Sequence, residues 1–202
     1  RRLCDTDQEG ASPLCNAVRF AHQEIAKCLS NLEKTNLKLG DRLGRCPLTL
    51  AVRYNRIDIV EHLWRKENVD VNQLDNIKRP PLGHAARFGN DRILEFMCQS
   101  VNKRVELDIN LPDVHGSTPL HLAVATGKLK SVEVLLENDD LNLQVRDHER
   151  KTPLEVAVQG NYYQIALMIA MKIEISQLDV NNQYEHKDTL LHMAVRLSLI
   201  HI

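Results

Sequence analysis

The stretch Gly116-Ser-Thr-Pro-Leu-His-Leu-Ala-Val-Ala-Thr-Gly127 decides how the rest of this 202-residue chain is interpreted. Its proline holds φ near about −65° and has no N–H to leave unpaired, so Pro119 suits the first turn of a helix. Thr118 stands directly before it and can cap that turn with its hydroxyl. The small side chain of Ala123 lets a neighbouring helix approach closely. The stretch therefore predicts a short helix packed against another.

The same marks recur along the chain at a nearly constant period. Five prolines, each followed by leucine, stand 34, 34, 38 and 34 residues apart, with alanine three residues after each leucine and aspartate six residues before each proline. The prolines are Pro13, Pro47, Pro81, Pro119 and Pro153, and the aspartates are Asp7, Asp41, Asp75, Asp113 and Asp147. A sixth unit starts at Val180, with Tyr184 and Leu190 where aspartate and proline are expected. A period of this length indicates a repeat protein.

Each unit carries a second apolar-periodic segment after the proline helix, such as Ile57, Ile59, Val60 and Leu63. Aspartate and often glycine follow before the next proline, which suits a tight protruding turn. No unit could bury its apolar face alone, so neighbouring units must stack. We predict an all-α repeat solenoid of stacked helix-turn-helix units with protruding β-hairpin loops.

These motifs resemble the ankyrin-repeat signature, and the 34-residue step is close to the roughly 33 residues of that family. The resemblance covers residues 5 to 196 and implies a single domain over residues 1–196. Departures are local: Cys46 and Pro80 replace the usual threonine, and Cys15, Thr49, Gly83 and Glu155 the usual histidine. We expect repeats near 5–38, 39–72, 73–110, 111–144 and 145–181, a partial repeat over 182–196, and longer loops near Val101–Val105 and Lys172–Gln177.

The two ends of the chain lead to separate expectations. The first residue is Arg1 rather than methionine, so we expect a fragment of a longer protein. Residues 197–202 do not continue the pattern and resemble the translation of a transposon end used in sequencing adaptors. We expect a non-native tail there. The alternative, a genuine apolar helix end, stays open.

Composition narrows the possible functions. Lysine and arginine total 26 against 27 aspartates and glutamates, for a net charge of −1, which argues against a general nucleic-acid or membrane-surface binder. No apolar run approaches the roughly 20 residues needed to cross a bilayer, so no membrane insertion is expected. The five cysteines form no CxxC pair, which favours buried thiols in a reducing, cytoplasmic setting.

Motifs of catalysis, cofactor binding or metal binding are missing from the sequence. There is no P-loop, GxGxxG, GxSxG, HExxH or Cys/His cluster of zinc spacing, so we expect neither an enzyme nor a cofactor or metal site. His121 and His192 fall on the signature's histidine, which ties neighbouring turns together, and His84 falls one residue later and is expected to be packed. Asn72 resembles the ankyrin asparagines that intracellular hydroxylases modify. A hairpin asparagine bonded to its local backbone is the favoured alternative.

In the ankyrin family, partners bind mainly on the concave side, at hairpin tips and at the two residues after the buried helix triplet. Carried over, these positions give ten candidate partner-binding residues: Arg19, Phe20, Arg42, Arg45, Arg53, Tyr54, Arg79, Arg87, Phe88 and His115. Across such positions the first three units have six arginines and one acid, Glu9. Arginine and aromatic residues are enriched at binding hot spots. Alternatively, each aromatic packs under the next unit and each arginine extends to water.

The leading hypothesis is a non-catalytic protein-protein interaction module, a monomeric scaffold that binds an acidic and partly apolar partner segment on its concave face. The alternative is a substrate-recruiting or tethering ankyrin arm of a larger enzyme, channel or secreted effector. Nucleic-acid binding through the candidate arginines is disfavoured, because the candidate residues include no lysine and the concave face is not expected to fit a duplex.

Overall fold

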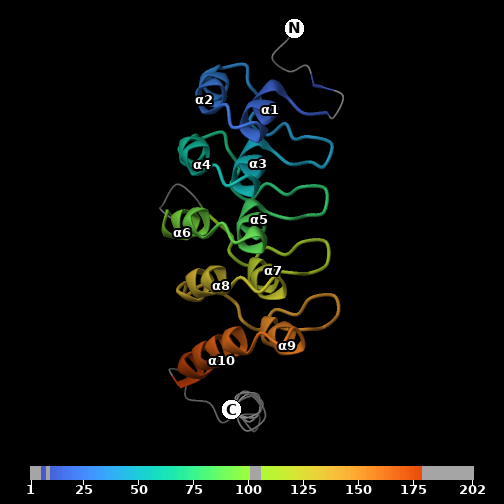
Figure 1. Cartoon of the computed structure of the whole chain (residues 1–202), viewed down its shortest axis with the longest axis vertical. Coiled ribbons are helices and arrows are strands. Elements are labelled where there is room, and N and C mark those ends of the chain that lie inside the picture. The colour runs from blue at the N-terminus through green and yellow to red at the C-terminus, as the bar shows by residue number, and fades with distance from the viewer. Residues whose placement is uncertain (1–5, 8–9, 101–105, 179–202) are drawn as a thin grey trace.

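The computed structural model describes residues 6–7, 10–100 and 106–178, and within them the chain forms ten helices in five successive pairs and no strand (Figure 1). The first helices of the pairs are α1 (Pro13–Arg19), α3 (Pro47–Arg53), α5 (Pro81–Phe88), α7 (Pro119–Ala125) and α9 (Pro153–Gln159). The second helices are α2 (Gln23–Asn31), α4 (Ile57–Trp64), α6 (Asp91–Gln99), α8 (Leu129–Leu136) and α10 (Tyr163–Leu178). The predicted all-helical repeat architecture is confirmed.

The recurring proline begins the first helix of every pair, as the sequence predicts. The residue before it caps the helix in four units, where the side chain of Ser12, Cys46, Thr118 or Thr152 accepts a bond from a backbone N–H in the first turn. Pro80 cannot do this, so α5 begins without a side-chain cap. The side-chain cap is therefore missing only in the described unit whose residue before the helix has no side-chain acceptor.

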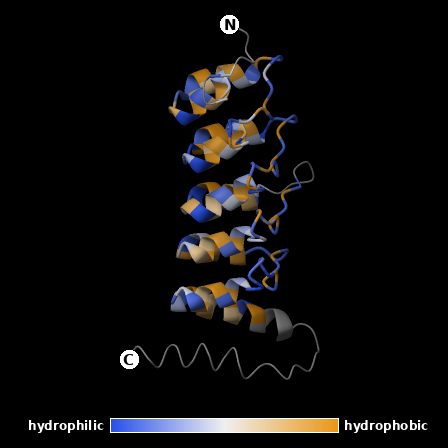
Figure 2. Ribbon diagram, turned by 90° about the vertical axis from the view of Figure 1, so that its right-hand side faces the viewer, coloured by the Kyte–Doolittle hydropathy of each residue, from blue (hydrophilic) through white to orange (hydrophobic). Residues whose placement is uncertain are grey.

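The helix pairs stack directly on one another. Each first helix contacts the first helix of the next pair, and each second helix contacts the next second helix, so the two rows lie side by side. In Figure 2 the layers lie one above the other, with the loops along one side. Leu50, Ala51 and Val52 of α3 are almost completely buried between layers. The core is therefore continuous from unit to unit.

The loops between pairs are tight turns organised by the recurring aspartate. In the loop of the second unit, between α2 and α3, the Asp41 carboxylate accepts bonds from the backbone N–H groups of Leu43, at 3.0 Å, and Arg45, at 3.1 Å. The aspartates in the loops of the third, fourth and fifth units accept the equivalent pair of bonds. Their predicted role in turn geometry is confirmed. The β-hairpin form of the loops is not, since no strand occurs in the described residues.

One predicted loop is wrong. A longer loop was expected near Lys172–Gln177, because the step from Pro153 to Leu190 is 37 residues rather than 34, but α10 runs unbroken from Tyr163 to Leu178. This stretch contains no glycine or proline and is rich in good helix formers, so the insertion lengthens the helix instead. The other predicted loop, near Val101–Val105, the sixth unit and the tail 197–202 lie outside the described residues.

Among the described residues, none of the helices combines the length and the apolar character that crossing a membrane requires.

Candidate functional site

Six of the ten candidate residues lie where the first helices of the first three units end. Arg19 and Arg53 are the last residues of α1 and α3, with Phe20 and Tyr54 directly after them, and Arg87 and Phe88 close α5. Phe20 is 63% exposed and Phe88 39% exposed. Tyr54, by contrast, is half-buried and packs against the core, as the alternative reading of the aromatics expected.

Two of these helix ends are joined by a stack of side chains. The guanidinium carbon of Arg53 lies 4.6 Å from the ring centroid of Phe88. The Phe88 ring also stacks on the His84 ring, nearly parallel at 6° with centroids 6.2 Å apart. Behind it, His84 Nε2 lies 2.8 Å from the Asp75 carboxylate. The structure thus holds Arg53 and Phe88 in a fixed relation that sequence spacing alone does not show.

Burial and hydrogen bonding set the charges in this stack. Burial lowers the pKa of His84, and this outweighs the opposing effect of the Asp75 carboxylate. Burial acts to raise the pKa of Asp75, but hydrogen bonds from His84 and from the Arg79 backbone bring it below its usual value. At neutral pH a neutral imidazole therefore donates Nε2–H to an ionised carboxylate. The prediction that His84 is packed rather than liganding agrees with this geometry.

Two candidate arginines are inside the protein rather than on a surface. Arg45 donates from Nε to the Asp41 carboxylate at 2.9 Å, and Arg79 donates from Nη2 to Asp113 of the next loop at 2.8 Å. Only 8% of each arginine side chain is exposed. Burial acts to raise the pKa of Asp41, but the bonds from Arg45 lower it overall. Both arginines hold loops together and leave almost no side-chain surface for a partner.

The other tip residues are exposed, and apolar side chains that were not among the candidates stand beside them. Arg42 and His115 are exposed, as are Leu43, Ile77 and Val114. Backbone bonds join these tips, from Asn76 N–H to Leu43 O at 2.9 Å and from Val114 N–H to Ile77 O at 2.8 Å. The sequence signal that could have identified these three exposed apolar residues is an apolar residue one or two positions after the turn aspartate.

The exposed cations differ between the early and late units. Arg42, Lys78 and Arg87 form no ion pair within the part of the chain that the structure describes. In the fifth unit two basic residues are neutralised, although the exposed Arg150 forms no ion pair among the described residues. Lys151 binds Glu149 at 2.6 Å, and Arg146 binds Glu155 at 3.1 Å. Unpaired positive charge therefore accompanies the exposed apolar side chains of the second and third units.

Side chains also link neighbouring units away from this surface. Asn72 donates to the backbone oxygen of Glu106 at 2.7 Å and accepts from the backbone N–H of Asp108 at 3.0 Å. Its partners belong to the next unit, so the expectation of a local backbone bond is wrong. His121 lies between the Thr118 hydroxyl, 2.8 Å from Nδ1, and the backbone oxygen of Lys151, 3.0 Å from Nε2. The predicted role of this histidine in tying neighbouring turns is confirmed.

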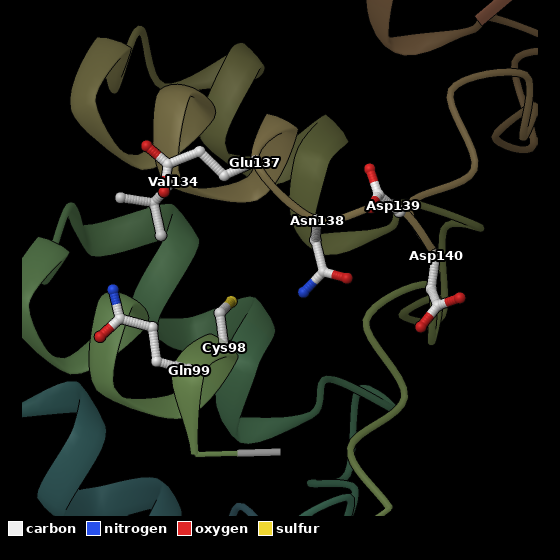
Figure 3. Close-up of a pocket in the computed structure, with 7 residues that line it drawn as sticks. All are labelled: Cys98, Gln99, Val134, Glu137, Asn138, Asp139 and Asp140. Atoms are coloured by element: carbon white, nitrogen blue, oxygen red, sulfur yellow. The ribbon is translucent and has the colours of Figure 1, made fainter. Parts of the chain in front are cut away.

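A separate pocket of about 370 Å³ lies between the end of α6 and the segment after α8 (Figure 3). Its lining includes Cys98, and burial together with the charge of Glu137 raises the pKa of that thiol to about 11. The thiol is therefore protonated at neutral pH and a poor nucleophile. No group of three or more histidine, cysteine or acidic residues in the described ranges is placed to hold a metal ion.

The cysteines depart from the expected burial in two cases, and one of them is Cys98, which is only half-buried. Cys15 and Cys46 are buried free thiols, as predicted, but Cys28 is an exposed free thiol on α2. Burial raises the pKa of both buried thiols. Cys4 lies outside the described residues.

A family model described as ankyrin repeats (3 copies) matches residues 2–75, 65–147 and 82–183. The chain belongs to the ankyrin-repeat family. Ankyrin repeats are general protein-interaction modules, so proteins are the class of partner that this fold implies. The two helix rows and the aspartate turns described above are therefore features of an ankyrin array.

Three curated proteins resemble parts of this ankyrin array. It is 33% identical over 82 residues to the human transient receptor potential cation channel subfamily A member 1, and 29% identical over 87 residues to alpha-latroinsectotoxin-Lt1a of Latrodectus tredecimguttatus. It is 26% identical over 97 residues to a "Probable serine/threonine-protein kinase" of Dictyostelium discoideum. The matches cover 41%, 43% and 48% of this chain but only 7%, 6% and 10% of those proteins.

Proposed function

We propose that this ankyrin array is a protein-interaction module that captures an acidic, partly apolar segment of a partner protein at its first three units. The observation that carries the proposal is the set of unpaired exposed cations, Arg42, Lys78 and Arg87, next to exposed Leu43, Ile77 and Phe88. We call these six residues the basic-apolar surface. Acidic side chains of a partner would neutralise the cations while its apolar side chains cover the exposed hydrocarbon.

The contact between Arg53 and Phe88 favours binding, because it orders these two side chains before a partner binds. A side chain that must become ordered on binding loses about 0.5–1.5 kcal/mol in conformational freedom. Arg53 already lies against the Phe88 ring, which in turn stacks on His84. Part of this ordering is therefore complete before a partner arrives. Arg53 can still present guanidinium N–H groups to a carboxylate, because a ring occupies only one of its faces.

The later units are less suited to the same partner. Their positions equivalent to Arg53–Tyr54 are Ala125–Thr126 and Gln159–Gly160, which offer neither a cation nor an aromatic ring. Lys151 and Arg146 are already bonded to glutamates of their own unit. We therefore confine the partner site to the first three units. The buried arginines Arg45 and Arg79 serve there as loop supports.

Charge reversal tests the site. In the double variant Arg53→Glu, Arg87→Glu, we expect loss of binding to a fluorescent peptide of alternating glutamate and leucine, measured by anisotropy, with an unchanged helical circular dichroism spectrum. The matched control is Arg65→Glu, Arg92→Glu, which makes the same charge change at exposed sites of the second helix row and should leave binding intact. A lysine–leucine peptide should not bind. Retention of glutamate–leucine binding by the first variant would show that the site is wrongly assigned.

The second candidate function is that of a recruiting or tethering arm in a larger protein. The observation in its favour is that the chain matches no more than 10% of the length of the relatives described above. Recovering the full reading frame around this segment tests it. A catalytic motif or a membrane-spanning helix encoded beyond either end supports the arm, and a frame without either contradicts it.

A further inference from the structure

One position of the second helix is exposed in the first unit and buried in the other four. The residues at this position, by the repeat spacing, are Ile25, Ile59, Ile93, Ser131 and Ile165. Ile25 is 54% exposed, whereas Ile59 is 1%, Ile93 0% and the last two at most 3% exposed. The side chain is the same in the first three units, so the difference lies in what surrounds it.

The buried members of this set face the preceding unit. Ser131 shows the direction, because its hydroxyl donates a hydrogen bond to the Asp91 carboxylate on α6, at 2.6 Å. Each unit from the second onward has a helix pair stacked before it, as α2 of the first unit is stacked before α4 of the second. The first unit has none within the described residues. Ile25 is therefore exposed where a preceding helix pair would cover it.

Two neighbouring positions behave in the same way. Pro13 is exposed, while the four later prolines at its position are buried. Leu29 is half-buried, while its equivalents Leu63, Met97, Leu135 and Ile169 are at most 1% exposed. A repeat that ends a solenoid normally presents a polar outer face to water. The first unit instead presents apolar side chains, as internal repeats do.

We propose that the outer face of α1 and α2, formed by Pro13, Ile25 and Leu29, is a repeat-stacking surface and that its occupant is a further ankyrin helix pair of the same polypeptide. This occupant is chosen by continuity with the interfaces inside the array, where helix pairs cover the equivalent residues in every later unit. At least one further repeat would then precede the five units in the solenoid. The proposal depends on burial alone and is independent of the basic-apolar surface.

The test is to supply the missing helix pair. A second copy of residues 39–72 is inserted directly before Asp5, which keeps the 34-residue spacing. This unit already stacks on the isoleucine Ile93 in the native array, so its outgoing face suits Ile25. We expect amides of α2 to exchange with deuterium at least about tenfold more slowly in the extended protein, since opening the first unit now breaks two stacked interfaces instead of one.

Lysine substitutions at this repeat position distinguish protection by stacking of the added unit from a general change in stability. Ile25→Lys should leave the exchange rates of the original chain within about twofold of wild type but remove the tenfold gain from the extended one. Ile59→Lys, at the buried equivalent, should destabilise the original chain strongly. The proposal is overturned if the extra unit gives no protection, or if Ile25→Lys weakens the original chain as Ile59→Lys does. A dimer in sedimentation analysis that Ile25→Lys dissociates would assign the surface to a second copy instead.

Discussion

The Arg53 guanidinium lies over the ring of Phe88, with its carbon 4.6 Å from the ring centroid, and so couples the ends of two successive first helices. Both residues were expected on one partner surface, and the structure shows that they first contact each other. Phe88 also stacks on His84, which is bonded to Asp75. Phe88, an exposed residue that we propose as part of the partner surface, is thus connected to the buried interior of the third unit.

The first prediction concerns this contact. Arg53→Gln removes the cation, Phe88→Leu removes the ring, and a double-mutant cycle between them should give a coupling free energy of about 0.5–1 kcal/mol, as expected for a partly exposed cation–π pair. Urea unfolding followed by circular dichroism measures it. A parallel cycle between Arg87→Gln and Phe20→Leu serves as control and should show no coupling. Equal coupling in both cycles would contradict a specific contact.

The second prediction concerns the buried ion pair between neighbouring loops. Arg79→Met leaves the Asp113 carboxylate, whose side chain is 0% exposed, without its cation. Removing one member of a buried pair typically destabilises a protein by about 3–5 kcal/mol. Arg42→Met changes an exposed arginine of the second loop and should alter the unfolding free energy by no more than about 0.5 kcal/mol. The interpretation fails if the two variants unfold at similar urea concentrations.

The third prediction concerns pH. Burial lowers the pKa of His84 below its usual 6.5, and Arg79 and Arg53 act in the same direction against Asp75. The unfolded chain, whose histidine pKa is about 6.5, therefore binds protons more readily than the folded chain. Stability is present in full above that pH and is lost as the pH falls through it toward the folded-state pKa.

His84→Leu should reduce this acid sensitivity, because the equivalent residues Leu50 and Leu122 are leucines that pack in the same place. The loss of unfolding free energy between pH 7.0 and about pH 5.5 should be smaller in the variant than in the wild type. In the wild type this window stays above the range in which Asp75, whose pKa is lowered, takes up a proton. In the variant the loss of the His84 bond raises the pKa of Asp75, which also makes the loss of stability at low pH smaller. His121 is present in both proteins and contributes equally to the acid-induced loss of unfolding free energy in each. Identical losses would rule out His84 as a source of the acid sensitivity.

The fourth prediction concerns turn strain. Lys78 has φ of 55°, at the loop position where the second and fourth loops have Gly44 and Gly116. This left-handed conformation is unfavourable for residues with a side chain. Lys78→Gly should therefore raise the unfolding free energy by about 0.5–1 kcal/mol, measured by urea titration. The reverse change, Gly44→Ala, should destabilise, since a Cβ there would press against Asn76. Loss of stability in Lys78→Gly would show that the lysine side chain contributes more than the strain removes.

The fifth prediction concerns thiol reactivity. Cys28 is exposed, whereas the Cys98 thiol has its pKa raised to about 11 by burial and by Glu137. Iodoacetamide at pH 8 should therefore alkylate Cys28 well before Cys98, as judged by peptide mass spectrometry. The urea-unfolded chain is the control, and there the two should react at similar rates. Comparable rates in the folded protein would mean that Cys98 is accessible and ionised.

The repeat pattern predicted most of the fold because its signals are local. A proline that begins a helix, an aspartate that closes a turn and an apolar period all act within a few residues, and each was found where the period put it. The fifth unit shows the limit of this reasoning. Its spacing revealed an insertion but not its conformation, and local helix propensity made it part of α10 instead of a loop.

The candidate site was predicted less completely, because position in a repeat does not say which way a side chain turns. Arg42 and Arg45 are three residues apart in one loop, yet one is exposed and the other is bonded to Asp41 in the interior. Leu43 and Ile77 were not among the candidates, and their exposure became meaningful only when backbone bonds joined their loops. Such pairings depend on contacts between residues about one repeat apart.

The sequence by itself determined the repeat, the family and the order of helices and turns, since these follow from backbone preferences and periodic burial within each unit. Only the tertiary structure decided that Arg79 pairs with Asp113, that Arg53 rests on Phe88, and that Ile25 is exposed while Ile59 is buried. The physical reason is that a buried charge must find its counter-charge, and an apolar face its cover, in the neighbouring unit. Both are properties of the stack rather than of any one repeat.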